Sequence, residues 1–294
     1  MKSQNRRQFL KISGLSVAAA IATAGCSGAA NQSQNSAPNP DSPPIPSGKK
    51  NINRLKFGLA SYTTRKLSLD QTIKIAQRTR LKYLALKDFH LPMDSSAEQC
   101  AAVAQKVKDA GLVLYGGGVI YMKTQAEVNR AFDYAQAAGM DTIIGVPGHD
   151  LLGLVEQKVK KYNIKVAIHN HGPGDKLYPT PASAYEKIKH LDSRLGLCID
   201  IGHTARAGQN PVEDALKFAD RLHDVHIKDV TAAAPNGQTL ELGRGVIDIP
   251  QFLRALLKIN YSNRVSFEYE KDADEPLPGL AESVGYARGV LTVI

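Results

Sequence analysis

Eight short apolar runs recur along the chain, and each is followed by polar residues and then by a segment with helical periodicity. The runs are rich in Val, Ile and Leu and have the length of strands buried on both faces. They lie at residues 56–60, 83–86, 112–115, 142–146, 165–168, 195–199, 222–227 and 264–267. Eight strand–helix repeats favour an α/β protein with a closed (β/α)8 TIM barrel over an open doubly wound sheet.

Residues typical of helix starts and helix ends support these boundaries. Helix-capping sequences begin at Ser68, Ser95-Ser96, Thr124 and Asn210-Pro211, where a side-chain oxygen can accept a hydrogen bond from the first helical turn. Gly111 and Gly139 stand where the second and third helices should end, which is typical of a left-handed residue after a helix.

A glycine run, Gly116-Gly117-Gly118, follows the third predicted strand. Its spacing does not match the dinucleotide-binding fingerprint. We expect these glycines to make room for the backbone beneath a substrate, the alternative being a flexible turn.

The first 52 residues differ in composition from the rest of the chain. Residues 1–25 contain Arg6-Arg7 followed by a short apolar run, and they resemble a twin-arginine export signal. The segment ending at Cys26 resembles a lipoprotein cleavage box, although Thr23 replaces the usual larger aliphatic residue, so either a lipid anchor at Cys26 or ordinary cleavage near Ala22 or Ala24 is expected. Residues 26–52, rich in Ser, Asn, Pro and Gly, are predicted to be a disordered linker, and residues 53–294 form the barrel. The location expected is periplasmic or membrane-anchored, at the inner or outer membrane.

Charge and cysteines exclude several classes of protein. The formal charge is +9, but four of the positive charges lie in the leader, which leaves +5 for the remainder. Without a basic stripe or block, nucleic acid is not expected as a partner. Three cysteines in 294 residues are too few for a disulfide-stapled fold, so no structural disulfide is expected.

Residues that could bind a metal or act in catalysis cluster after the later strands. Six of the eight histidines fall at or just past predicted strand ends: His90, His149, His169, His171, His203 and His226. Because the carboxyl ends of parallel strands meet at one rim, imidazoles and carboxylates there predict a metal centre, with a purely structural role as the alternative. This donor type suits one divalent ion of manganese, zinc, cobalt or iron. Strand alternation places His226 with Lys228, and Glu268 with Glu270, on common faces.

At these residues the chain resembles the xylose isomerase-like TIM barrels, the superfamily of sugar phosphate isomerases and epimerases and of AP endonuclease family 2. The resemblance runs from Arg54 to about Asp272. It implies one divalent ion bound by Asp200, His226 and Glu268, with His169 at the fifth-strand position where the family usually has a glutamate. That substitution removes the paired carboxylates of the family's epimerases, so another base is expected to act.

Part of the chain also resembles endonuclease IV. Asp200-Ile201-Gly202-His203 matches its Asp-x-x-His, and Gly243-Arg244-Gly245 matches its Gly-x-Gly. However, Gly237-Gln238-Thr239 stands where that enzyme has the ligands of further zinc ions, so a phosphodiesterase is not expected. His203 is expected either to face the substrate or to orient Asp200 by a hydrogen bond.

The remaining site residues are predicted from their positions at the rim. Proton carriers are expected to be Glu270, His203 and Lys228, in that order, with Asp229 holding Lys228 in place. Candidates for substrate binding are Lys87, His90, His171 and Arg65, with Ser61 and Tyr62 beside them; Arg65 is alternatively a solvated start of the first helix.

The function expected is an exported, metal-dependent sugar isomerase or epimerase that acts on an unphosphorylated sugar or keto-sugar through an enediolate. The alternatives are a lyase or hydratase of 3-keto-glycosides with the same metal site, and a non-catalytic sugar-binding lipoprotein. The partner is a small carbohydrate. The oligomeric state stays open.

Overall fold

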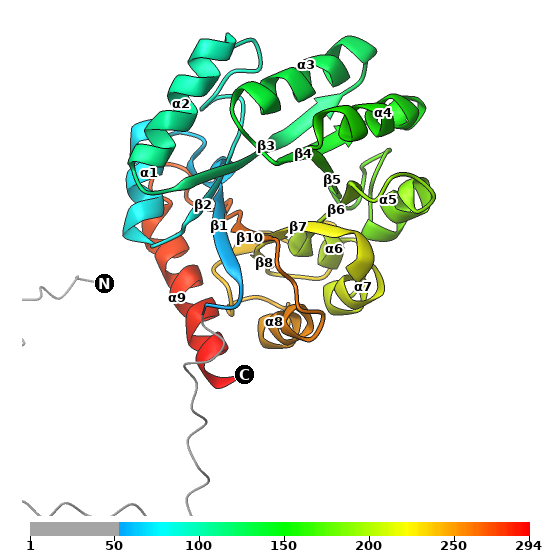
Figure 1. The fold of residues 1–294 in the computed structure, drawn as a ribbon. Coiled ribbons are helices and arrows are strands. Elements are labelled where there is room, and N and C mark those ends of the chain that lie inside the picture. Colours follow the sequence, from blue (N-terminus) through cyan, green and yellow to red (C-terminus); the bar gives the residue numbers. More distant parts are fainter. Residues whose placement is uncertain (1–52) are drawn as a thin grey trace, which may run out of the picture. The chain divides into compact units, whose positions relative to one another are not determined.

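Strand–helix repeats close around one central sheet (Figure 1). A computed structural model describes residues 53–294, so the predicted leader 1–25, Cys26 and the linker 26–52 lie outside the described residues. The strands of the barrel are β1 (Lys56–Ala60), β2 (Tyr83–Leu86), β3 (Val113–Met122), β4 (Thr142–Pro147), β5 (Lys165–His169), β6 (Leu195–Asp200), β7 (Leu222–Ile227) and β10 (Arg264–Phe267).

Helices surround this barrel and cover its outer face (Figure 1). They are α1 (Leu69–Arg78), α2 (Ala97–Asp109), α3 (Gln125–Ala137), α4 (Leu152–Tyr162), α5 (Pro181–Ile188), α6 (Ile201–Arg206), α7 (Pro211–Lys217), α8 (Ile249–Lys258) and α9 (Leu277–Val293). Short 3-10 turns lie at Ser61–Thr64, His149–Leu151 and Ala219–Arg221, and β8 (Asp229–Val230) pairs with β9 (Thr239–Leu240) outside the barrel.

The order of the strands confirms the predicted fold. The barrel closes as β1-β10-β7-β6-β5-β4-β3-β2, and every neighbouring pair is parallel. Seven of the eight predicted strands match within two residues at each end, but β3 continues seven residues beyond the predicted end at Tyr115.

The core fills the barrel and the layer between strands and helices. Every residue of β4, β6 and β7 is buried, as expected for a parallel sheet that is covered on both faces. This packing holds the rim of the barrel in place, and the rim carries the polar residues described below.

The glycine run lies inside β3 and not after it, so the alternative of a flexible turn is wrong, while room beneath a substrate stays a prediction. A Cβ atom at Gly116 would lie 2.9 Å from the carbonyl oxygen of Thr142, and one at Gly117 would lie 3.0 Å from the ring of Tyr134. These glycines therefore allow close packing against the neighbouring strand and helix, because a side chain would collide there.

The predicted helix boundaries are confirmed at their caps. Ser68, Ser96, Thr124 and Asn210 accept hydrogen bonds from the first turns of α1, α2, α3 and α7. Gly111 and Gly139 follow α2 and α3 with φ of 77° and 64°. Cys100 and Cys198 are buried and free, which confirms the absence of a disulfide among the described residues.

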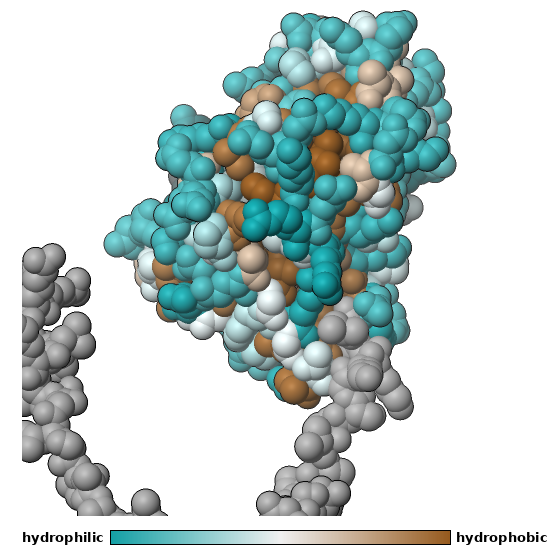
Figure 2. All heavy atoms as spheres, turned by 90° about the vertical axis from the view of Figure 1, so that its left-hand side faces the viewer, coloured by the Kyte–Doolittle hydropathy of each residue, from teal (hydrophilic) through white to brown (hydrophobic). Residues whose placement is uncertain are grey.

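The outer surface carries few large apolar side chains. Figure 2 shows a mostly hydrophilic face, with hydrophobic residues between the hydrophilic ones. Among residues 53–294, no helix combines the length and the apolarity needed to cross a bilayer.

Candidate metal centre and active site

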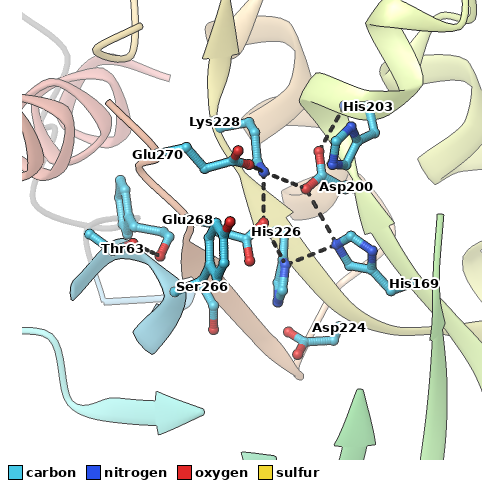
Figure 3. Close-up of polar contacts among 12 residues, drawn as sticks. Thr63, His169, Asp200, His203, Asp224, His226, Lys228, Ser266, Glu268 and Glu270 are labelled. Atoms are coloured by element: carbon cyan, nitrogen blue, oxygen red, sulfur yellow. Dashed lines mark hydrogen bonds and ion pairs between the residues drawn. The ribbon is translucent and has the colours of Figure 1, made fainter. Parts of the chain in front are cut away.

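Four side chains meet at the carboxyl ends of consecutive strands. Strand register pairs Asp200 with His226 and His226 with Ser266, while His169 pairs with Cys198. Because side chains two residues apart share a face, Asp200 lies on the same face as Cys198, and Glu268 on the same face as Ser266. The barrel's register therefore brings the polar ends of β5, β6, β7 and β10 to one point (Figure 3).

The four predicted metal ligands are close enough to share an ion. One donor atom each from His169, Asp200, His226 and Glu268 lies within 4.8 Å of the others. His169 Nε2 lies 3.1 Å from His226 Nδ1 and 3.4 Å from Asp200 Oδ2, and His226 Nδ1 lies 3.2 Å from Glu268 Oε2. Two imidazoles and two carboxylates suit a borderline divalent cation.

One unsatisfied polar atom of the cluster also fits a cation. Asp200 Oδ2, one of the oxygens that face the other ligands, is buried and accepts no well-directed hydrogen bond. Buried polar atoms are usually hydrogen-bonded, so this oxygen can still take part in coordinating a ligand. The residues present therefore fit a divalent ion.

Lys228 is the fifth member of the cluster. Its ammonium lies 2.9 Å from Asp200 Oδ2 and 2.6 Å from Glu268 Oε2, and it also contacts Glu270 (Figure 3). Three carboxylates and one ammonium leave a formal charge of −2 when the imidazoles are neutral, which a divalent cation balances.

Burial and neighbouring charges set the protonation of this cluster. Burial lowers the pKa of Lys228, but Asp200, Glu268 and Glu270 outweigh it and raise that pKa well above its usual value. Burial likewise raises the pKa values of Asp200 and Glu268, but Lys228 holds both well below their usual range. Lys228 is therefore an ammonium at neutral pH, and its expected role as a proton carrier stays a prediction.

The two imidazoles differ in protonation. Burial lowers the pKa of His169 to about 3, so its ring is neutral and can offer a lone pair. Burial also lowers the pKa of His226, but Cys198 and Glu268 together raise it well above its ordinary value. Because burial raises the pKa of Cys198 to about 12 and keeps it a thiol, we assign the effect on His226 to Glu268. A metal ion would replace that proton.

Asp229 does not hold Lys228, contrary to the sequence-based expectation. Its Oδ2 accepts hydrogen bonds from the backbone of Gly243 and Gly245, each at 3.0 Å, and its Oδ1 accepts from Ile247 at 3.1 Å. The segment that resembles Gly-x-Gly is thus a loop folded around Asp229, which positions the chain after β7.

A cavity of about 340 Å³ opens above the cluster. It is lined by Tyr62, Lys87, Val119, Tyr121, His169, His171, His203, Glu268 and Glu270. Of the residues predicted to carry protons or bind substrate, the structure therefore brings Lys87, His171, His203 and Glu270 together at the cavity.

Two predicted substrate-binding residues lie elsewhere. His90 is buried, with Nε2 2.9 Å from the carbonyl oxygen of Leu67 and 3.1 Å from Thr72 Oγ1. Arg65 donates a hydrogen bond of 2.6 Å to the carbonyl oxygen of Glu270, and its guanidinium lies over the ring of Tyr62. Neither lines the cavity, and Arg65 precedes α1 instead of starting it. Arg65 fixes the backbone that carries Glu270.

His203 lies in the first turn of α6 and faces the cavity with its ring. The hydrogen bond that links it to Asp200 comes from its backbone nitrogen, at 2.8 Å, and caps the helix. A guanidinium nitrogen of Arg206 lies 3.3 Å from its Nδ1. Because guanidinium only donates, Nδ1 accepts and the neutral ring carries its proton on Nε2. Burial lowers the pKa of His203, so the ring is neutral at neutral pH.

Sequence reasoning missed two residues of the lining, Val119 and the aromatic Tyr121. Its ring stacks on His171 with centroids 5.6 Å apart, and its hydroxyl lies 3.2 Å from His171 Nε2. The apolar run Val119-Ile120-Tyr121-Met122 carries the signal, and extending the third strand through that run would have found Tyr121 at the rim.

A buried polar layer closes the barrel beneath the metal centre. The hydroxyl of Tyr115 donates a hydrogen bond of 2.8 Å to Asp224 and lies 2.6 Å from Ser266 Oγ. Burial raises the pKa of Asp224 to about 6. This layer supports His226 from below and separates the centre from the far end of the barrel.

A family model decides the relationship of this chain to known proteins. The model of the xylose isomerase-like TIM barrel matches residues 86–289, which is more than half of the chain. The chain belongs to this family. The resemblance inferred from the metal-ligand residues is confirmed.

Two relatives are similar to this chain in sequence. The rhizopine catabolism protein MocC of Rhizobium meliloti is 28% identical over 158 residues, which cover 47% of this chain and 46% of that protein. An inosose dehydratase of Clostridium botulinum is 23% identical over 214 residues, covering 57% and 68% respectively. The chain thus matches about half to two thirds of the length of these relatives.

A solved structure titled as the IOLI protein with a binding zinc atom superposes with a TM-score of 0.65. It is 18% identical, and the match covers 81% of this chain and 98% of that one. At this identity the superposition supports the barrel fold.

Proposed function

We propose that this protein is a divalent-metal-dependent enzyme that removes water from an unphosphorylated keto-sugar. The observation that carries the proposal is the asymmetry of the cavity, with the carboxylate of Glu270 on one wall and the imidazole of His203 on another, facing each other across Lys228 (Figure 3). The dehydratase names of the curated relatives support it.

The residues at the cavity have separate tasks in this reaction. When bound by His169, Asp200, His226 and Glu268, a divalent ion supplies a Lewis acid that polarises the substrate carbonyl. Glu270 takes the proton from the carbon next to that carbonyl. His203, with its Nε2 proton, donates a hydrogen bond to the hydroxyl that leaves from the following carbon. The proton and the departing hydroxide together make one water, so the reaction needs no other reactant.

Lys228 has an electrostatic task. Its ammonium is buried and lies between Asp200 and Glu268. A fixed positive charge in a site from which water is excluded stabilises negative charge that develops on a substrate oxygen. It also holds Glu270 in a defined orientation.

Isomerisation or epimerisation is the second candidate, because it begins with the same proton abstraction. Glu268 and Glu270 are a carboxylate pair on one strand end and favour it. However, both contact the Lys228 ammonium from the same strand, whereas epimerisation needs proton carriers on opposite faces of one carbon. The arrangement therefore favours loss of water.

An incubation in heavy water separates these functions. When the protein is loaded with manganese or zinc, we expect inosose or a related keto-sugar to lose one water. NMR and mass spectrometry would monitor the reaction. An epimerase would instead return a product of unchanged skeleton that carries deuterium next to the carbonyl. Binding of the sugar without exchange or loss of water would identify a binding protein and refute the enzyme.

We propose further that the protein is exported. The support is the Arg6-Arg7 leader, which resembles a twin-arginine signal, and Cys26 is the candidate for a lipid anchor. Replacing both arginines by lysine should leave the full-length precursor in the cytoplasm, as measured by fractionation and immunoblotting. A wild-type chain that stays in the cytoplasm would contradict export, and the same fractions labelled with a radioactive fatty acid test Cys26.

A further inference from the structure

Three hollows lie in a row on the rim of the barrel. The cavity above the metal centre shares Lys87, Val119 and Tyr121 with a second hollow of about 210 Å³. The second hollow shares Asp88, Met93 and Arg130 with a third, more open one of about 460 Å³. The three hollows therefore adjoin one another along the rim, beside the loop after β2 and the start of α3.

The second hollow combines the two kinds of surface that bind a sugar. Met93 and Ile120 supply apolar wall, while Asp88, Glu127 and Arg130 supply charged groups. Carboxylates and guanidinium make strong hydrogen bonds to hydroxyl groups, and the apolar wall accepts the carbon face of a ring.

The charged groups of this hollow are available to a ligand. Arg130 is exposed and makes no hydrogen bond or ion pair with any residue in the range 53–294. Glu127 uses one oxygen, Oε2, to accept a hydrogen bond of 2.7 Å from the backbone of Lys123. Asp88 lies 3.6 Å from Lys87 and is 58% exposed at its side chain.

Tyr121 stands at the junction between the first two hollows. It is 44% exposed although it is a large aromatic residue, and its stacking on His171 fixes the orientation of its ring. A fixed, exposed aromatic ring is a stacking surface for a second flat-faced group.

We propose that the second hollow is a subsite for a second sugar unit, so that the substrate is an oxidised disaccharide or glycoside and not a free monosaccharide. The reacting ring lies over the metal centre, and the second unit crosses Tyr121 and is bound by Arg130 and Glu127. This proposal rests on the proposed function and defines the substrate class of the same site.

Paired substrates test the subsite by turnover. With the metal-loaded protein, kcat/KM for loss of water from an inosose that carries a β-glucosyl unit should exceed that for free inosose by about tenfold or more, the effect of one hydrogen bond to a charged group. Arg130→Ala should reduce this ratio to near one without changing kcat/KM for the single ring. Arg254→Ala, an exposed arginine of α8, serves as the control and should leave the ratio unchanged.

Binding tests the subsite without turnover. In calorimetry, cellobiose should bind the metal-loaded protein about tenfold more tightly than glucose, and Arg130→Ala should abolish the difference. Equal affinity for the two sugars, or no binding of either, overturns the subsite whatever the reaction is. Tighter binding of cellobiose without turnover of any ketone refutes the proposed reaction and leaves the subsite standing.

Discussion

His226→Ala should remove the proposed divalent ion and abolish measurable turnover. The substitution deletes one of four donors in a cluster whose donor atoms lie within 4.8 Å of one another. Loss of even an outer-shell partner weakens metal binding by about 10–100-fold, so loss of a ligand should weaken it by at least ~100-fold. Elemental analysis of the purified protein and steady-state kinetics measure the two effects.

Asp200→Asn should also remove the metal, and it should disturb the fold less than Asp200→Ala. Asp200 Oδ1 also caps α6 by accepting the backbone hydrogen bond of His203, so Asp200→Ala loses about 1 kcal/mol of helix stability in addition to the metal. Asp200→Asn keeps an oxygen for the cap and replaces the second oxygen with an amide that cannot bind a cation. It should therefore lose the metal while its circular dichroism and Tm stay close to those of the metal-free wild type.

The control is a histidine of the same strand. His223 lies on β7 and contacts the carbonyl oxygen of Ser193 at 2.8 Å, outside the metal centre. His223→Ala should keep one metal ion per chain and most of the activity. A His226→Ala protein that still holds one ion per chain, or equal metal loss in His223→Ala, would show that the ligands have been misassigned.

Lys228→Met should destabilise the metal-free protein more than the metal-loaded one. Lys228 is 3% exposed, and its removal leaves Asp200 and Glu268 buried without the ammonium that neutralises them. Breaking a buried ion pair by removing one partner costs about 3–5 kcal/mol. A divalent cation offers the same carboxylates a new counter-charge, so it should recover most of this loss.

Thermal and chemical unfolding measure the effect with and without added manganese or zinc. The gain in the free energy of unfolding on adding the ion should be larger for Lys228→Met than for the wild type, while activity stays low because the fixed charge is absent. Lys271→Met is the matched control, since Lys271 pairs with Glu241 and is 41% exposed at its side chain. Equal stability of the metal-free Lys228→Met and wild-type proteins would contradict the role assigned to Lys228.

Much of the fold was readable from the sequence because its signals are local. Apolar runs of strand length, capping residues such as Ser68 and Thr124, and the helix-ending Gly111 each act within a few residues. The exception is β3, whose glycines were taken as the end of the strand. Glycine usually weakens a strand. At Gly116 and Gly117, however, Thr142 and Tyr134 lie too close to leave room for a larger side chain.

The metal-ligand positions were also predictable, because a parallel barrel brings all strand ends to one rim. His169 and Asp200 each end a strand, His226 is next to last in β7, and Glu268 directly follows β10. The structure places the donor atoms of all four together. Their role as ligands stays a prediction until metal content is measured.

The sequence by itself determined the barrel, the order of its elements and the strand ends at which polar residues gather. Only the tertiary structure decided what each polar residue contacts: Lys228 lies among three carboxylates and not beside Asp229, His90 turns toward Leu67, and Tyr121 reaches the cavity. The physical reason is the separation along the chain over which each interaction acts. Periodicity and capping depend on neighbours in the chain. The contacts named here join residues that are 23 to 50 positions apart, and they depend on strand register and side-chain direction.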